Sequence, residues 1–181
     1  VFKFTNIQLN KNAGFVSVEK DGFLKGSRTV FTTAGTINHV NIQLIPRIVK
    51  GTFSAAAGGT ITLQAGVQVA FPGAAIINTA NNQPYTGAVS VSGAYLDPTD
   101  PNLSLIMPGN LTGLTTDNEQ KILKTYGMIA VELTGAGNEK LNMATGKEAT
   151  ITMSIPASLQ ARAPTTMPLW YFDETKGIWV E

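Results

Sequence analysis

The most obvious candidate for catalysis in this chain is its single histidine, His39, because Asp, Glu and Ser are too common to point to a site. The chain has no cysteine, which excludes a cysteine nucleophile, a disulfide and the usual His/Cys zinc site. A histidine that acts as a general base needs a nucleophile within hydrogen-bond reach, and the sequence around His39 shows no serine–aspartate pattern. We therefore predict a structural or surface role for His39 and no enzymatic activity. A hydrolase would need a pocket where His39 meets a serine and a carboxylate.

Oxygen ligands for a metal are concentrated in residues 97–102, which hold two carboxylates and an amide. Calcium binds about six to eight oxygen atoms, so Asp97, Asp100 and Asn102 could supply part of a calcium site. The ligand order of an EF-hand loop and its glycine are missing. Asp and Asn also cap turns by accepting hydrogen bonds from nearby backbone N–H groups. We favour the turn interpretation over calcium, and no other cofactor is indicated.

Aromatic side chains near the C-terminus could bind a ligand. Exposed rings stack on sugar rings or on partner proteins, so the candidate binding residues are Trp170, Tyr171, Phe172 and Trp179. Along a strand, Trp170 and Phe172 point to one side and Tyr171 points to the other. Both tryptophans lie in apolar alternation where a β-sandwich needs large residues. We therefore favour core packing over a sugar-binding platform.

Composition excludes several classes of partner. Lys and Arg total 13 and Asp and Glu total 12, a formal net charge of +1, and the basic residues are scattered. This balance predicts no binding to nucleic acid. No run of about 18 apolar residues occurs, which predicts no transmembrane segment. Only 14 % of residues are charged, and this low content, together with much threonine and glycine, favours an extracytoplasmic β-protein.

The dominant hydrophobic period is two residues, which predicts strands rather than helices. Each candidate strand has an apolar face and a face of Ser, Thr, Gln or Asn, as a sheet with one side on a core requires. Short strands separated by frequent turn signals predict an all-β fold, an antiparallel β-sandwich. The expected strands are residues 1–7, 15–20, 39–45, 60–64, 66–71, 88–92, 128–133 and 149–155.

Two short helical turns are expected in addition to the strands. Residues 116–119 have the Thr-x-x-Glu form of a capping box, and residues 156–161 place a proline near the start of a turn. The glycines at positions 58 and 59 are not a phosphate-binding loop, because the Walker spacing is absent. They are expected to begin a strand at a tight corner.

A module boundary is expected near residues 46–51. Three stretches of the segment before it form a recognisable pattern: Val1-Phe2-Lys3-Phe4-Thr5-Asn6-Ile7, Val16-Ser17-Val18-Glu19-Lys20-Asp21-Gly22-Phe23 and Val40-Asn41-Ile42-Gln43-Leu44-Ile45-Pro46. By these stretches the segment resembles the later part of a carboxypeptidase regulatory-like (transthyretin-like) domain. The resemblance implies that residues 1–46 form an incomplete smaller β-sandwich with open edges, which invite pairing. We expect this part to pack on the second module or to self-associate with another copy.

A second pattern follows the boundary and includes Gly58-Gly59-Thr60-Ile61-Thr62-Leu63, Tyr85-Thr86-Gly87-Ala88-Val89-Ser90-Val91 and Tyr95-Leu96-Asp97-Pro98. By these residues, residues 51–181 resemble the β-sandwich modules shared by ankyrins, netrin receptors and zonula occludens protein, and their bacterial surface relatives. Residues 168–179 are similar to bacterial cell-surface and lipoprotein sequences and to parts of the cartilage intermediate layer protein. Some relatives of this module cut themselves at a His-Phe-Ser site, but residues 170–173 contain neither histidine nor serine. Self-cleavage is therefore not implied.

These patterns predict a non-catalytic structural or interaction module of a secreted or surface-anchored bacterial protein. Such a module would present rigid loops and edge strands to a protein or a surface glycan, for example in adhesion. The alternative is a carbohydrate- or ligand-binding β-sandwich module, which needs exposed aromatic rings beside polar groups in a concave site. Both ends of the chain lie inside alternating apolar patterns, so we expect it to be part of a longer polypeptide.

Overall fold

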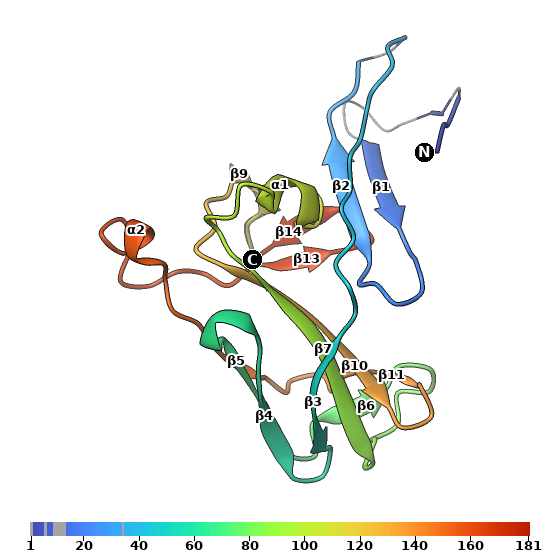
Figure 1. Cartoon of the computed structure of the whole chain (residues 1–181), viewed down its shortest axis with the longest axis vertical. Helices are drawn as coiled ribbons and strands as arrows, with labels where there is room; N and C mark the ends of the chain where they lie inside the picture. The colour runs from blue at the N-terminus through green and yellow to red at the C-terminus, as the bar shows by residue number, and fades with distance from the viewer. Residues whose placement is uncertain (1, 6, 9–13, 34) are drawn as a thin grey trace.

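The structure is a computed structural model that describes residues 2–5, 7–8, 14–33 and 35–181. Its strands form sheets of two, eight and four strands. Figure 1 shows the eight-stranded sheet curling through the lower part of the molecule, with the other two sheets above it. The expected all-β fold with antiparallel sheets is confirmed.

The eight-stranded sheet has the order β12-β5-β4-β3-β7-β10-β11-β6, and its neighbours are antiparallel. Strands β7 and β10 are the longest and pair from Met128 opposite Leu96 to Gly135 opposite Val89. A 3-10 turn at Gln64–Gly66 joins β4 to β5. The strands of this sheet are β3 (Val49–Ser54), β4 (Gly58–Thr62), β5 (Gln68–Pro72), β6 (Ile76–Asn78), β7 (Ala88–Leu96), β10 (Met128–Gly135), β11 (Lys140–Met143) and β12 (Thr150–Thr152).

The larger core cluster lies against this curled sheet. Val89 and Val91 are both 0 % exposed, because residues two apart on a strand share one face. The rings of Phe53 and Phe71 stack beside them, with centroids 4.9 Å apart. Full burial of each valine stabilises the fold by about 1.5–3 kcal/mol. Other members of the cluster are Ile61, Leu63, Val67, Val69, Ile76, Leu133 and Leu141.

The four-stranded sheet has the order β13-β14-β8-β9. Strand β14 pairs with β8 in parallel, with Trp179 beside Gly113, and it is the one parallel pair among the described strands. A parallel pair needs a long crossover, and the chain between β8 and β14 supplies it. This pair departs from the expected purely antiparallel arrangement. The four strands are β8 (Thr112–Leu114), β9 (Gln120–Ile122), β13 (Tyr171–Asp173) and β14 (Ile178–Val180).

The N-terminal hairpin, β1 (Gly14–Val18) and β2 (Gly26–Val30), packs on the end of the four-stranded sheet. The ring centroids of Phe15 and Phe172 lie 6.0 Å apart. The hydroxyl of Thr29 donates a hydrogen bond of 2.7 Å to the carbonyl of Gly177. The front of the chain therefore packs on the later part.

A buried arginine strengthens this contact. Nη1 of Arg28 donates to the carbonyl of Gly109 at 3.0 Å, and the hydroxyl oxygen of Ser27 accepts from the Gly109 N–H at 3.2 Å. Burial lowers the pKa of Arg28 from its usual value, and its Nη2 has no hydrogen-bond partner. Leu24 is 4 % exposed and belongs to the same core cluster as Met128. The hairpin and the later strands thus share one core at this place.

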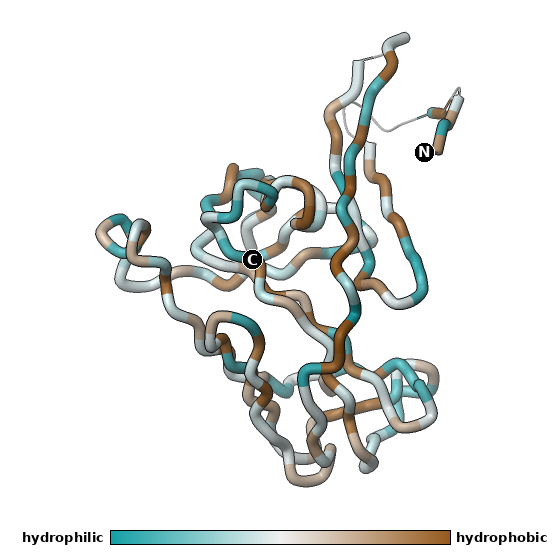
Figure 2. The backbone as a smooth tube through the Cα atoms, in the orientation of Figure 1, coloured by the Kyte–Doolittle hydropathy of each residue, from teal (hydrophilic) through white to brown (hydrophobic). Residues whose placement is uncertain are grey.

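The strand expected at residues 39–45 is wrong. The segment alternates apolar and polar residues along its length (Figure 2), but it lies outside any strand. Its backbone bonds go to different elements: the carbonyl of Ile45 accepts from Leu24 at 2.8 Å, and the N–H of Gln43 donates to Leu105 at 2.9 Å. A strand needs consecutive bonds to one neighbour, and this segment crosses several neighbours instead.

The helical turn expected at residues 116–119 is also wrong, because this segment is the turn of the β8–β9 hairpin. The N–H of Asn118 donates to the carbonyl of Thr115, and the N–H of Thr115 donates to the carbonyl of Glu119, both at 2.9 Å. Asn118 has a φ of 63°, as the last residue of a three-residue hairpin loop requires. The hydroxyl of Thr115, not Thr116, accepts from the N–H of Glu119.

The other helices and strands agree with the expected ones only in part. The helical turn at residues 156–161 is confirmed as α2 (Ala157–Gln160), with Pro156 before it. A second helix, α1 (Leu103–Ile106), was not expected. The strand expected at 149–155 shortens to β12. For the strand expected at 1–7, residues 1 and 6 lie outside the described part, and residues 2–5 and 7 are not in a strand. Among the described residues, no helix has the length and apolar character needed to span a membrane.

Candidate functional site

The candidate site lies on one face of the four-stranded sheet, which we call the outer face. The opposite face holds Phe172, Trp179 and Gly113, which the register places side by side. The rings of Phe172 and Trp179 pack in the core. Neighbours in register share a face of the sheet. The outer face therefore holds two rows of side chains. One row is Tyr171, Val180, Leu114 and Gln120, and the next is Asp173, Ile178, Thr112 and Ile122.

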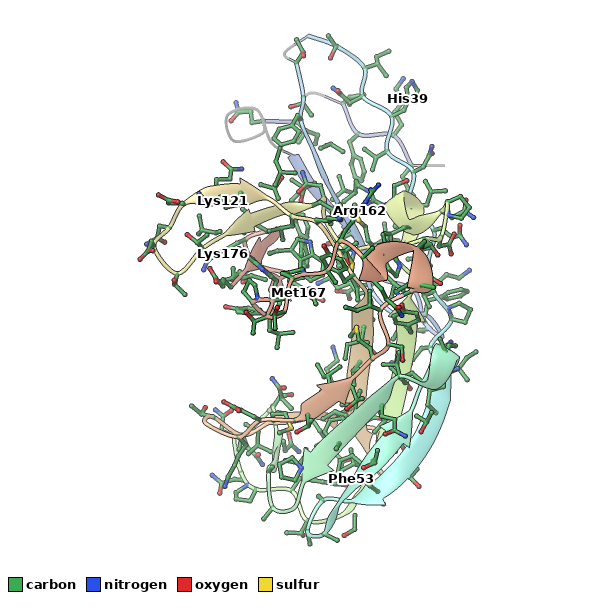
Figure 3. All side chains as sticks on the ribbon, turned by 90° about the vertical axis from the view of Figure 1, so that its left-hand side faces the viewer. His39, Phe53, Lys121, Arg162, Met167 and Lys176 are labelled. Atoms are coloured by element: carbon green, nitrogen blue, oxygen red, sulfur yellow. The ribbon has the colours of Figure 1, made fainter. Side chains whose placement is uncertain are left out.

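Large apolar side chains are exposed on the outer face and at its margins. Ile122 is 91 % exposed and Tyr171 is 59 % exposed. Leu169 and Met167, which precede β13, are also exposed, and so is Phe31 at the end of β2. Figure 3 shows Met167, Lys176 and Lys121 on one side of the upper part of the molecule. Exposed large apolar side chains gathered on one sheet face are typical of an interaction site.

A pocket of about 110 Å³ opens at the margin of this face. The front of the chain contributes Thr29 and Phe31, and the later strands contribute hydroxyl, amide and apolar groups. Lys176 also lines the pocket, and its ammonium lies 3.3 Å from the carboxylate of Asp173. The polar groups that line the pocket can hydrogen-bond a neutral ligand. The other lining residues are Asn110, Thr112, Gln120, Gly177 and Ile178.

Asp173 holds the turn beside the pocket. Its Oδ1 accepts hydrogen bonds from the hydroxyl of Thr175 at 2.5 Å, from the N–H of Thr175 at 2.9 Å and from the N–H of Lys176 at 3.1 Å. These bonds, the Thr175 hydroxyl above all, lower the pKa of Asp173 to about 2. Gly177 has a φ of 67° and closes the β13–β14 turn. The charged carboxylate thus orders this hairpin.

We predict that the turn loosens in strong acid. The pKa of Asp173 is lower in the folded state than the usual value of 3.8, so its stabilising effect is present above about pH 4 and is lost as the pH falls through about 2. The amide proton of Thr175 should follow this titration in an NMR experiment, with a midpoint near 2. Asp173→Asn, which keeps an acceptor oxygen, should abolish the titration. A midpoint near 4 in the unmodified chain would contradict the prediction.

The carboxylates proposed for calcium are engaged in turns. Oδ1 of Asp97 accepts from the hydroxyl and N–H of Thr99 at 2.6 and 2.7 Å, and the Thr99 hydroxyl is the main cause of a lowered pKa of Asp97. Oδ1 of Asp100 accepts from the N–H of Asn102 at 2.7 Å. Within the described ranges, no three His, Asp or Glu side chains are grouped to hold a metal ion. The favoured turn interpretation agrees with these bonds, and calcium stays the less favoured alternative.

The four candidate aromatic residues do not share one surface. Trp179 is buried, and Trp170 and Phe172 pack half-buried on the same cluster. The rings of Phe172 and Trp179 meet edge to face, with centroids 5.4 Å apart. Tyr171 alone of the four lies exposed on the outer face. Ligand binding by this group stays a prediction that depends mainly on Tyr171.

Several residues of this site were not among those expected from the sequence. His39 is exposed and lies near the top of the molecule in Figure 3, away from Lys176. Phe31, Gln120 and Ile122 were not candidates, because each stands in a short or interrupted pattern. The sequence signal for this site was Ile122, an apolar residue directly after the polar residues 115–121.

Comparison with known proteins gives a limited likeness. No family model and no solved structure matches the chain. It is 31 % identical over 102 residues to cartilage intermediate layer protein 1 of Sus scrofa, covering 56 % of this chain and 16 % of that protein. It is 29 % identical over 105 residues to cartilage intermediate layer protein 2 of Homo sapiens, covering 56 % and 9 %. The chain thus spans less than a fifth of the length of these relatives.

The likeness corrects one expectation. The prediction of a bacterial protein and of a lipoprotein is wrong, because the relatives are animal proteins named for cartilage. The short motifs behind that prediction are features of β-sandwich strands and turns, and a fold does not define a source or function. A tissue name of this kind agrees with the expected location outside the cytoplasm.

Proposed function

We propose that the chain is a non-catalytic interaction module outside the cytoplasm, and that it binds a protein through the outer face. The observation that carries the proposal is the group of exposed apolar side chains on and around a sheet, with Tyr171 and Ile122 at its two edge strands. Exposed apolar surface costs free energy in water, and binding of a partner removes that cost. We include in this proposal that residues 51–181 form a module like those of ankyrins and netrin receptors.

The outer face is supported by a rigid scaffold. The opposite side of the same sheet packs Phe172 and Trp179 in the core, so the strands cannot shift without opening a cavity. The β13–β14 turn is held by the three hydrogen bonds to Asp173. A preorganised surface loses little conformational entropy on binding, which suits a module whose role is to present a surface.

The test compares two double variants of the whole chain. The proposal's probe is a soluble extract of cartilage matrix, passed over the immobilised chain. Tyr171→Ser with Ile122→Ser should lower retention at least tenfold, because a few large side chains carry most of the affinity of an interface, and these two are large and exposed. Ile37→Ser with Ile48→Ser removes exposed isoleucines outside the outer face and should change retention less than twofold. Equal losses for both variants, or no retention of any component by the unmodified chain, would count against the proposal.

A carbohydrate-binding role is the second candidate. The pocket combines the amides of Asn110 and Gln120 and the hydroxyl of Thr112 with the ring of Phe31, and sugar sites use such groups. A glycan array should then show selective signals that Gln120→Ala removes. Uniform silence of the array would exclude this candidate.

A further inference from the structure

Strand β9 is an unprotected edge of the four-stranded sheet. It lies last in the order β13-β14-β8-β9, and all three of its residues are exposed. Ile122, at 91 %, is the most exposed of the large hydrophobic residues among those described. An edge strand offers a row of free backbone donors and acceptors to any extended chain.

The hydrogen bonds of the β8–β9 hairpin show which backbone N–H and C=O groups of β9 point away from β8. Glu119 accepts from Thr115 at 2.9 Å, and Leu123 donates to Leu111 at 2.8 Å. In an antiparallel pair, every second residue bonds to the same neighbour. The residues at 119, 121 and 123 therefore direct their backbone groups toward β8.

Gln120 and Ile122 lie between these residues, so their N–H and C=O groups point away from β8 to the open edge. Their side chains lie on the outer face, Gln120 beside Leu114 and Ile122 beside Thr112. Gln120 also lines the pocket. A chain that adds to this edge could place alternate side chains on the outer face, next to the pocket.

The charge of Lys121 favours some added strands over others at the edge of β9. Its side chain is 54 % exposed, and its partner Glu119, with atoms 2.6 Å apart, is 65 % exposed, so the ammonium can be shared. A second copy added antiparallel about a two-fold axis at this residue would set Lys121 opposite Lys121, and like charges directly opposite destabilise a sheet. A lysine on an edge is also a known guard against self-pairing.

We propose that β9 binds an extended segment of a partner protein as an additional strand, with a carboxylate opposite Lys121 and apolar or hydroxyl side chains flanking it. The inference rests on the proposed function and assigns it a partner class. Backbone bonds to Gln120 and Ile122 hold the strand, and the flanking side chains meet the outer face and the pocket. Recognition therefore combines a main-chain match, which any extended segment satisfies, with a charge that selects among such segments.

The probe is a displayed library of seven-residue peptides with alternating apolar and free positions, selected on the whole chain. Enriched peptides should carry Asp or Glu at the central position. Synthetic copies of the enriched peptides should slow amide hydrogen exchange at Gln120 and Ile122 at least tenfold when bound. No enrichment, or exchange at these two amides that stays unchanged at saturation, would overturn the proposal.

Two variants separate the backbone from the side chain. Ile122→Pro removes the outward N–H at a place where an edge strand tolerates proline, whereas Ile122→Ala keeps the N–H. The proline variant should bind the enriched peptides at least tenfold more weakly than the unmodified chain, and the alanine variant less than threefold. Equal binding by both variants would overturn a main-chain interaction, and the exchange measurement on the unmodified chain decides the matter if the proline variant unfolds.

Charge reversal tests the selection by Lys121. Lys121→Glu should weaken binding of the acidic peptides at least fivefold and favour peptides with a central lysine. If instead sedimentation shows a dimer of the unmodified chain that Ile122→Pro dissociates, the occupant is a second copy and the proposal is wrong. Loss of matrix retention in the Tyr171 and Ile122 serine variant, with full retention in Ile122→Pro, would overturn strand addition and leave the proposed function intact.

Discussion

Replacing Gly58 with alanine is expected to destabilise the fold by about 2–5 kcal/mol, the sum of backbone strain and overpacking. Gly58 has a φ of +77°, a conformation that side chains with a Cβ disfavour. A Cβ at this position would overlap the carbonyl oxygen of Phe71 and lie 2.7 Å from the amide nitrogen of Gly73. Both obstacles are backbone atoms of the neighbouring strand β5 and its turn, so the β4–β5 pairing must shift to make room.

A matched control separates the two causes. Gly146 has a φ of +75°, but no atom lies within 4 Å of the position that a Cβ would occupy there, so Gly146→Ala should cost only about 1–2 kcal/mol of backbone strain. Urea unfolding followed by far-UV circular dichroism measures both variants. If Gly58→Ala costs no more than Gly146→Ala, the close backbone approach at Gly58 is not a constraint on the fold.

Truncation of Leu24 should also have a large effect, although this residue lies in the N-terminal part. Leu24→Ala is expected to cost about 2–5 kcal/mol, because Leu24 is 4 % exposed in a cluster with Leu96, Met128 and Trp179. The loss should appear in the later strands as well, since they share that core. Both tryptophans of the chain lie in or against this cluster, so tryptophan fluorescence during urea unfolding reports on it directly.

The control for Leu24 is a residue of the same part that makes no core contact. Ile37 is 84 % exposed, and Ile37→Ala should change the unfolding free energy by less than about 0.5 kcal/mol. Leu24→Ala should shift the fluorescence transition to lower urea as one step. Two separated transitions, or an unchanged fluorescence midpoint, would show that residues 1–46 fold apart from the rest.

Local patterns predicted the side-chain faces well. Alternation placed Trp170 and Phe172 on one side and Tyr171 on the other, and in the structure the first two pack half-buried on the core while the third is exposed. It also predicted the strand that buries Val89 and Val91. A period of two residues is set by the strand itself, and burial of the apolar face then follows for any partner sheet.

Local patterns predicted the wrong structure where the neighbouring segment determines the conformation. Residues 39–45 alternate as regularly as β7 does, yet their backbone bonds go to Leu24 and Leu105 in different elements. At residues 116–119, a motif that favours a helix start is instead a hairpin turn, because β8 and β9 pair on either side of it. Local sequence limits the conformations that a segment can adopt, and contacts with neighbouring segments select one of them.

The sequence alone determined that this protein is built from strands with one oily and one polar face, joined by tight turns, and the reason is that these features depend on residues a few positions apart. The candidate site depended on the tertiary structure. The parallel pairing of β14 with β8 sets Trp179 beside Gly113, so that the neighbouring Ile178 and Thr112 line one pocket, to which the docked hairpin adds Phe31. These contacts join segments that lie far apart in the sequence, and no periodic pattern encodes which distant strands pair, because pairing is decided by the shape and burial of the whole sheet.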